Sequence, residues 1–183
     1  YTIQNYLADQ ITVPRFSTEL PEFAEAEKAV QARIDHLMGI KGKKSVDSIH
    51  KELGHIMWEY VGMGRTEEGL KTALKLLKDI RKEFETNLFI PGSTEGVNIE
   101  LEKALRLNDF ITMGELIAYD ALNRNESCGG HFREEYQTEE GEAKRDDENY
   151  FYVSCWEYQG SDDVAPVLYK EPLVYEAIKV QTR

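Results

Sequence analysis

The sequence predicts a mainly α-helical protein: an up-and-down antiparallel bundle of three to four helices, spectrin-repeat-like, with a short C-terminal β-hairpin tail. Apolar residues recur at spacings of three and four through most of residues 21–125, which is the period of one buried helix face. After residue 149, aromatic and β-branched residues form short runs on either side of a loop with glycine and proline, as in a hairpin. The length of 183 residues suits one domain with an appendage.

The N-terminal part predicts two helices. Residues 1–7 are amphipathic and indicate the end of a helix that begins earlier, and Pro14 breaks the pattern. The second helix should begin at Pro21 and stop at Gly39, because proline is favoured in the first turn of a helix and glycine at its end. The apolar face expected for it comprises Phe23, Ala26, Val30, Ile34 and Leu37.

Two capped helices are expected next. Ser45 can cap a helix that ends at Gly62, with Asp47 placed favourably in its first turn. Thr66 can cap a longer helix that stops before Pro91. The buried face expected of the first comprises Val46, Ile49, Leu53, Ile56 and Tyr60. That of the second comprises Leu70, Ala73, Leu77, Ile80, Phe84 and Leu88.

A fourth helix is expected over residues 98–124. Its apolar side chains are distributed around almost the whole circumference of the helix, so other parts of the protein should cover the helix on several sides. They are Leu101, Leu105, Leu107, Phe110, Ile111, Met113, Leu116 and Ile117. Because the connections between the four helices are short, neighbouring helices should run antiparallel, and residues 21–125 should form the bundle domain.

The tail, residues 126–183, begins with a polar stretch. Residues 126–149 contain three glycines and few large apolar side chains, so we expect this stretch to have weak packing of its own. Residues 150–158 then predict one strand, residues 160–166 a loop, and residues 167–169 a second strand.

Composition argues against several classes of function. The formal net charge of -12 disfavours binding to nucleic acid or to an anionic membrane surface, which relies on Lys and Arg. No stretch approaches the roughly 20 consecutive apolar residues of a membrane-spanning helix. Cys128 and Cys155 are too few for a disulfide framework and are interpreted as reduced thiols.

The segment Glu126–Arg133 is the most unusual candidate for chemistry. Cys128 lies near His131 in the sequence, but adjacency alone does not lower the pKa of a thiol, so we assign no nucleophile. Together with Cys155 these residues offer three ligands, whereas a structural zinc site needs four. The acidic stretch 134–148 lacks the spacing of a calcium loop, and no glycine-rich loop follows a predicted strand. We therefore predict no catalytic, cofactor-binding or metal-binding residue in this chain.

Five short motifs occur in a specific order along the chain. They are Ile56–Gly62, Arg65–Leu70, Leu105–Asn108, Arg124–Ser127 with Gly129, His131 and Arg133, and finally Arg145–Asn149. In this order the chain resembles, over nearly its whole length, the C-terminal region of the flavoprotein subunit of succinate dehydrogenases and fumarate reductases. It departs from that family at Cys128, where Arg is usual, and at Tyr150, where Trp is usual. The related L-aspartate oxidases and adenylylsulfate reductases share this kind of helical domain.

The resemblance implies a subunit that interconverts succinate and fumarate with FAD and passes electrons to an iron-sulfur subunit, then through a membrane anchor subunit to a quinone. Such a subunit is a peripheral part of a membrane complex, on the cytoplasmic side. In the family, the flavin-binding fold and the dicarboxylate site lie upstream of this region. Residues 1–20 are then expected to be the severed end of the flavin domain and a linker. No residue here matches a family catalytic position, so this chain alone is expected to be inactive and to bind no FAD.

The helical domain is then expected to act as a buttress for the upstream flavin-binding domain. The polar residues directly after the 98–124 helix are candidates for docking against that domain; the alternative is that they are solvated. These residues are Glu126, Ser127, His131 and Arg133. Two other interpretations stay open: a stand-alone helical protein-interaction module, and the equivalent domain of an L-aspartate oxidase.

Overall fold

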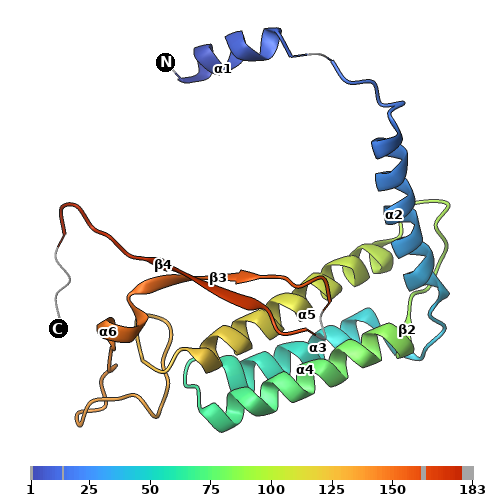
Figure 1. Cartoon of the computed structure of the whole chain (residues 1–183). Helices are drawn as coiled ribbons and strands as arrows, with labels where there is room; N and C mark the ends of the chain where they lie inside the picture. The colour runs from blue at the N-terminus through green and yellow to red at the C-terminus, as the bar shows by residue number, and fades with distance from the viewer. Residues whose placement is uncertain (1, 14, 162–163, 179–183) are drawn as a thin grey trace.

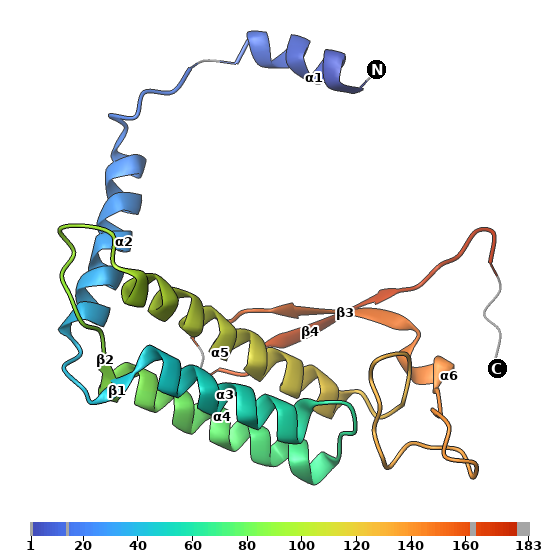
Figure 2. The same ribbon diagram turned by 180° about the vertical axis from the view of Figure 1, so that it is seen from behind.

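Three long helices form the centre of the molecule. The computed structural model describes residues 2–13, 15–161 and 164–178. Helices α3 (Val46–Val61), α4 (Glu67–Asn87) and α5 (Ile99–Asn123) lie side by side in both views (Figures 1 and 2). The chain also forms a β-hairpin after these helices, from β3 (Tyr152–Glu157) and β4 (Val167–Pro172). The predicted fold class, a mainly α-helical bundle with a C-terminal hairpin, is confirmed. The remaining elements are α1 (Thr2–Ile11), α2 (Pro21–Gly39), β1 (Lys44–Ser45), β2 (Leu88–Phe89) and α6 (Asp147–Tyr150).

The N-terminal caps of the bundle helices lie where the sequence places them. The side chain of Ser45 accepts a hydrogen bond from the backbone amide of Ser48, and that of Thr66 accepts one from Gly69. Asn98, which was not predicted as a cap, caps α5 in the same way. Each cap satisfies one of the amide groups that have no partner within the first turn of a helix.

The core lies between α3, α4 and α5. The expected apolar faces of α3 and α4 are buried, apart from Tyr60, which is partly exposed. Gly114 lets α5 come close to both neighbours, because a Cβ atom there would lie 3.1 Å from the sulfur of Met57 and 3.7 Å from Leu77. The core residues from these helices include Ile49, Leu53, Ile56, Leu70, Ala73, Leu77, Ile80, Phe84, Ala104, Leu107, Ile111 and Ala118.

A short parallel strand pair, which the sequence analysis did not predict, ties two helix ends together. β1 precedes α3 and β2 follows α4, with Lys44 opposite Leu88 in the register. The ammonium group of Lys44 lies 2.7 Å from a carboxylate oxygen of Glu52 and also contacts Glu83. Two residues per strand carry too little pattern to predict a strand from sequence.

Helix α2 is formed as predicted, but its apolar face is not buried. Leu37 is buried in the core and Ile34 packs against it partly buried, whereas Phe23 is 50% exposed and Val30 is 60% exposed. Figure 1 shows α2 projecting from one end of the bundle, with α1 further away. The expectation that α2 is a full member of the bundle is therefore wrong. Apolar residues spaced three and four apart predict that a helix has an apolar face. They do not predict that other residues of this chain pack against that face.

Helix α5 is covered on fewer sides than expected. Leu101, Leu107 and Ile111 face the core. Phe110, Met113 and Ile117 lie on another face and are 46%, 52% and 42% exposed. Phe110 stacks on His50 of α3, with ring centroids 5.5 Å apart. The prediction of cover on several sides thus holds toward α3 and α4 and holds only in part along this second face.

The hairpin differs from the prediction at its ends. Residues 147–150 form the short helix α6, which Asp146 caps, so the first strand begins at Tyr152 rather than at Tyr150. The second strand extends to Pro172, three residues beyond the predicted end. Trp156 of β3 packs edge-on against Tyr119, with ring centroids 5.0 Å apart. This contact anchors the hairpin to α5.

Candidate functional site

A polar cluster joins the C-terminal ends of α3 and α5 to the segment that follows α5. Arg65 donates from Nε to the carbonyls of Val61 and Gly62, at 3.1 and 3.2 Å. The last carbonyls of a helix have no partner within it, and the helix dipole favours a cation there. Arg65 therefore closes the end of α3.

Arg133 closes the end of α5 in the same way. Its side chain is fully buried, and Nη1 donates to the carbonyl of Ala121 at 3.1 Å. Its Nε donates to Glu135 at 3.0 Å, and Glu135 also accepts a hydrogen bond from the backbone amide of Glu67. The hydroxyl of Ser127 accepts from the Arg133 amide at 2.8 Å and donates to its carbonyl at 3.1 Å. One arginine thus connects α5, the following segment and the start of α4.

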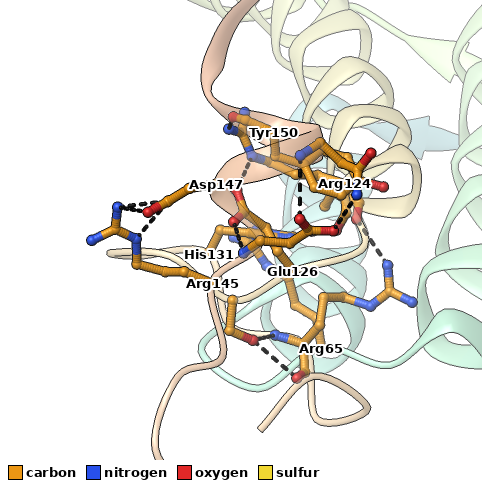
Figure 3. Close-up of polar contacts among 12 residues, drawn as sticks. Arg65, Arg124, Glu126, His131, Arg145, Asp147 and Tyr150 are labelled. Carbon is orange, nitrogen blue, oxygen red and sulfur yellow. Dashed lines mark hydrogen bonds and ion pairs between the residues drawn. The ribbon is translucent and has the colours of Figure 1, made fainter. Parts of the chain in front are cut away.

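The carboxylate of Glu126 holds the far end of the segment in place (Figure 3). It is buried, and it accepts from Arg124 Nε and from the backbone amide of Asp146, both at 2.9 Å. Arg124 also donates to the carbonyl of Tyr150 at 2.6 Å. Charge-assisted bonds of this kind are stronger than neutral ones, so residues 124–150 are drawn into a closed loop.

Both ring nitrogens of His131 have partners that fix its protonation state. Nη1 of Arg65 lies 2.9 Å from Nδ1, and the carbonyl of Arg124 lies 2.9 Å from Nε2. Since guanidinium only donates and a carbonyl only accepts, Nδ1 must accept and Nε2 must carry the hydrogen. Burial, together with the charges of Arg65, Arg133 and Arg124, lowers the pKa of His131, although its bond to the carbonyl opposes this. The imidazole is therefore neutral at pH 7.

All four residues predicted to dock against another domain lie in this cluster. Glu126, Ser127 and Arg133 are buried by residues of this chain, and His131 is partly buried. Docking through these side chains stays a prediction. The expectation that the segment has weak packing of its own is wrong for its two ends, because buried polar bonds replace the missing apolar contacts.

Two residues of the cluster, Arg65 and Arg124, were not predicted as site residues. Arg124 caps the C-terminal end of α5, and Arg65 follows the last residue of α3 by four positions, so each lies near a helix end where a cation complements the helix dipole. That position was a usable signal. What the sequence does not reveal is that the two arginines meet through His131, which lies 66 residues after Arg65.

An open cavity of about 430 Å³ lies beside the cluster, between α5, the turn at residues 128–131 and β3. Arg65, Arg124 and His131 form one wall, and Ile117 and Trp156 lie on others. Asp120 also lines it, and one of its carboxylate oxygens accepts a hydrogen bond from Trp156 Nε1 at 2.7 Å. The cavity therefore combines guanidinium groups with an apolar rim.

Neither thiol is part of a metal centre in the described residues. Cys128 and Cys155 are free and exposed, and no group of three or more His, Cys, Asp or Glu side chains there is arranged to hold a metal ion. In the same part of the chain, no helix combines the length and the hydropathy that crossing a membrane requires.

Comparison with known proteins decides the family. The family described as fumarate reductase flavoprotein C-term matches residues 50–183, which include the whole bundle from early in α3, the polar cluster and the hairpin. The chain belongs to this family of oxidoreductases. The five sequence motifs are thus confirmed as a sign of the succinate dehydrogenase and fumarate reductase flavoproteins.

Three relatives illustrate how far the similarity reaches. The fumarate reductase flavoprotein subunit of Proteus vulgaris is 29% identical over 148 residues, 79% of this chain and 24% of the relative. An uncharacterized FAD-dependent oxidoreductase of Methanocaldococcus jannaschii is 31% identical over 112 residues, 61% of this chain and 20% of the relative. A chloroplastic L-aspartate oxidase of Nicotiana tabacum is 37% identical over 88 residues, 48% of this chain and 13% of the relative. The chain spans a quarter or less of each.

A solved quinol-fumarate reductase with menaquinol molecules has the same fold over this region. The superposition has a TM-score of 0.75 at 22% identity and covers 92% of this chain and 28% of the other. The arrangement of helices and hairpin is therefore that of a fumarate reductase flavoprotein C-terminal region.

Proposed function

We propose that this chain is the C-terminal helical part of a flavoprotein subunit that interconverts succinate and fumarate. The observation that supports it most is the family match over residues 50–183, which takes in both the bundle and the polar cluster. In this proposal the subunit holds FAD and passes electrons to an iron-sulfur subunit, then through a membrane anchor to a quinone. The subunit lies on the cytoplasmic side of the membrane, as a peripheral part of the membrane complex.

The described residues themselves do not fit FAD. A dinucleotide site of the common kind needs a parallel sheet and a glycine-rich turn that leads from a strand into a helix. The described parallel pair, β1–β2, is two residues long, and Gly62 and Gly64 lie between two helices. We therefore place FAD and the dicarboxylate in the remainder of the subunit, and no step of the reaction in this chain.

The role left to this chain is mechanical. Hydride transfer requires the reacting groups to be held in register, and rigid packed elements hold a site better than loops do. The bundle supplies that rigidity through its apolar core. The arginines that close α3 and α5 attach the 126–150 segment to the same rigid body.

The test uses the complete subunit that contains this chain, beside the 183-residue chain alone. After reconstitution with FAD, the complete subunit should show flavin absorbance and should reduce fumarate with a reduced viologen dye. The chain alone should stay colourless and inactive. Stoichiometric flavin and turnover in the chain alone, or neither in the complete subunit, would contradict the proposal.

A second candidate is the equivalent domain of an L-aspartate oxidase. It is favoured by the Nicotiana tabacum relative, whose 37% identity exceeds that of the fumarate reductase subunit over a shorter stretch. The same preparation separates the two. Oxidation of L-aspartate with oxygen, without oxidation of succinate, would select the second candidate.

A further inference from the structure

A second cavity, of about 300 Å³, lies between α4, α5 and the turn of the β3–β4 hairpin. It is a different cavity from the one beside the polar cluster, although Leu116 and Trp156 line both. In Figure 1 the turn of the hairpin lies beside α5. Small-molecule sites have volumes of about 300 to 1,000 Å³, so this cavity has room for one or two fused rings. We call it the hairpin cavity.

Aromatic side chains form much of the wall of the hairpin cavity. Trp156 is half-buried and is held in place twice: its ring packs edge-on against Tyr119, and its Nε1 donates to Asp120 at 2.7 Å. Tyr119 and Tyr158 also line the cavity, and Leu74 of α4 adds aliphatic surface. Aromatic side chains held in fixed positions favour a flat ring that packs against their faces or edges. The wall therefore favours a planar aromatic ligand.

The charged groups that line the hairpin cavity differ in whether they have partners. The carboxylate of Glu115 lies 2.6 Å from Nη2 of Arg81, so its charge is already paired. The ammonium group of Lys78 has no hydrogen bond or ion pair with any residue in the part of the chain that the structure describes. An ammonium group donates its strongest hydrogen bonds to anionic oxygens. The cavity therefore favours a ring that carries one carboxylate.

We propose that the hairpin cavity binds a small planar aromatic carboxylate. Its ring packs against Trp156 and Tyr158, and its carboxylate accepts a hydrogen bond from the ammonium group of Lys78. The inference goes beyond the proposed function, because succinate and fumarate have no ring to fill an aromatic cavity. Binding of the aromatic acid and interconversion of succinate and fumarate can therefore be tested separately.

The position of the hairpin cavity gives the ligand a structural effect. Lys78 belongs to α4, Tyr119 to α5, and Trp156 to strand β3 of the hairpin, so one bound molecule contacts all three elements. Without a ligand, Trp156 already attaches the hairpin to α5 through Tyr119 and Asp120. A ligand that also contacts α4 stabilises the closed arrangement, because anything that binds one conformation preferentially increases its population. Binding should therefore slow local opening of the hairpin.

The probe is 2-naphthoate, titrated into the complete subunit and followed by saturation-transfer NMR of the ligand. A molecule of this size should bind with a Kd of about 1 mM. Two matched compounds separate the ring from the charge: cyclohexanecarboxylate has the charge without a planar ring, and 2-naphthalenemethanol has the ring without the charge. Each should bind at least about fivefold more weakly, and succinate should not compete. No binding of 2-naphthoate, or equal binding of cyclohexanecarboxylate, would overturn the proposal.

Two variants of the complete subunit locate the site. Lys78→Gln should weaken binding of 2-naphthoate about fivefold and leave that of 2-naphthalenemethanol unchanged, because only the charged compound uses the ammonium group. The matched control is Lys82→Gln, at an exposed lysine one turn further along α4 that does not line the cavity. Ala165→Phe, at an exposed position in the hairpin turn, places a ring in the cavity and should abolish binding of both compounds. Wild-type binding in both Lys78→Gln and Ala165→Phe would overturn the proposal.

Hydrogen exchange tests the effect on the hairpin. With 2-naphthoate at ten times its Kd, the backbone amides of β3 in the complete subunit should exchange about tenfold more slowly, whereas those of α1, far from the cavity, should not change. Binding without slower exchange in β3 would place the probe elsewhere. Binding to the 183-residue chain but not to the complete subunit would mean that another part of the subunit fills the cavity. Either result would overturn the proposal.

Discussion

The three-helix bundle and the segment from Arg124 to Tyr150 belong to one body but are held by different forces. The bundle is closed by apolar side chains such as Leu77 and Phe84, which are fully or almost fully buried. The segment is closed by buried polar groups, with Arg133 and Glu126 at its centre. The difference teaches that a stretch poor in apolar residues can still be ordered, provided that every buried charge has partners. In the described part of the chain, every buried side-chain nitrogen and oxygen has one.

The largest effect should follow from opening the apolar core. Leu77 is fully buried between α3, α4 and α5, so Leu77→Ala should lower the free energy of unfolding by about 2 to 5 kcal/mol. Urea unfolding followed by helical circular dichroism measures it. Leu7→Ala on the exposed helix α1, where Leu7 is 56% exposed, should change the value by less than about 0.5 kcal/mol. A small loss for Leu77→Ala would mean that the wrong face of α4 has been assigned to the core.

A smaller and more local effect should follow from Arg133→Met. Methionine fills similar space but leaves the carbonyls of Ala121 and Leu122 without their donor, and an unsatisfied buried acceptor costs about 1 to 3 kcal/mol. Limited proteolysis between residues 134 and 145 should become faster. Arg106→Met, at an exposed arginine, should leave both the cleavage rate and the stability unchanged.

If Arg133→Met instead lowered stability as much as Leu77→Ala, the segment and the bundle would unfold as one unit. The contrast between local and global stability would then be wrong. If the protease cleaved residues 134–145 at the same rate in the complete subunit as in the chain alone, the segment would need no neighbour to be ordered.

The pH dependence of stability should isolate His131. Its pKa in the folded chain is lowered from the ordinary 6.5, so below pH 6.5 the unfolded chain binds more protons than the folded one. Stability from this group is therefore complete above pH 6.5 and falls as the pH falls below it. Protonation would break the bond from Arg65 to Nδ1 and add a charge near Arg65, Arg124 and Arg133.

The variant His131→Gln separates this residue from the other three histidines. A glutamine amide can donate to the carbonyl of Arg124 and accept from Arg65 but does not titrate. The difference in unfolding free energy between wild type and this variant should change between pH 7.5 and pH 5, with the wild type losing more. A difference that stays constant over this range would mean that His131 is not held neutral.

Sequence periodicity predicted the bundle because its core repeats. Leu70, Leu77 and Phe84 lie seven residues apart on one face, and all are buried. Phe23 and Val30 show the same spacing and are exposed. The spacing of apolar residues predicts a helix face but does not specify which part of the chain, if any, covers that face. The polar cluster was harder still. Arg65 and His131 meet only after the chain has folded, and no spacing rule relates residues 66 positions apart.

The smallest effect should come from Gly114→Ala in the middle of α5. Replacing a glycine inside a helix with alanine gains about 0.8 to 1.0 kcal/mol of helix propensity. Against this, the new Cβ would lie 3.1 Å from the sulfur of Met57, which is close but faces a flexible, partly exposed thioether that can move. We expect the free energy of unfolding to rise by less than about 1 kcal/mol, because the flexible side chain of Met57 can move to make room for the new Cβ atom. Gly42→Ala is the matched contrast, since its Cβ would lie 1.9 Å from the backbone carbonyl carbon of Asn87 and should destabilise the β1–β2 end of the molecule. A loss of stability in Gly114→Ala comparable with that of Gly42→Ala would show that the bundle around Gly114 is as intolerant of displacement as the closely packed backbone beside β1–β2.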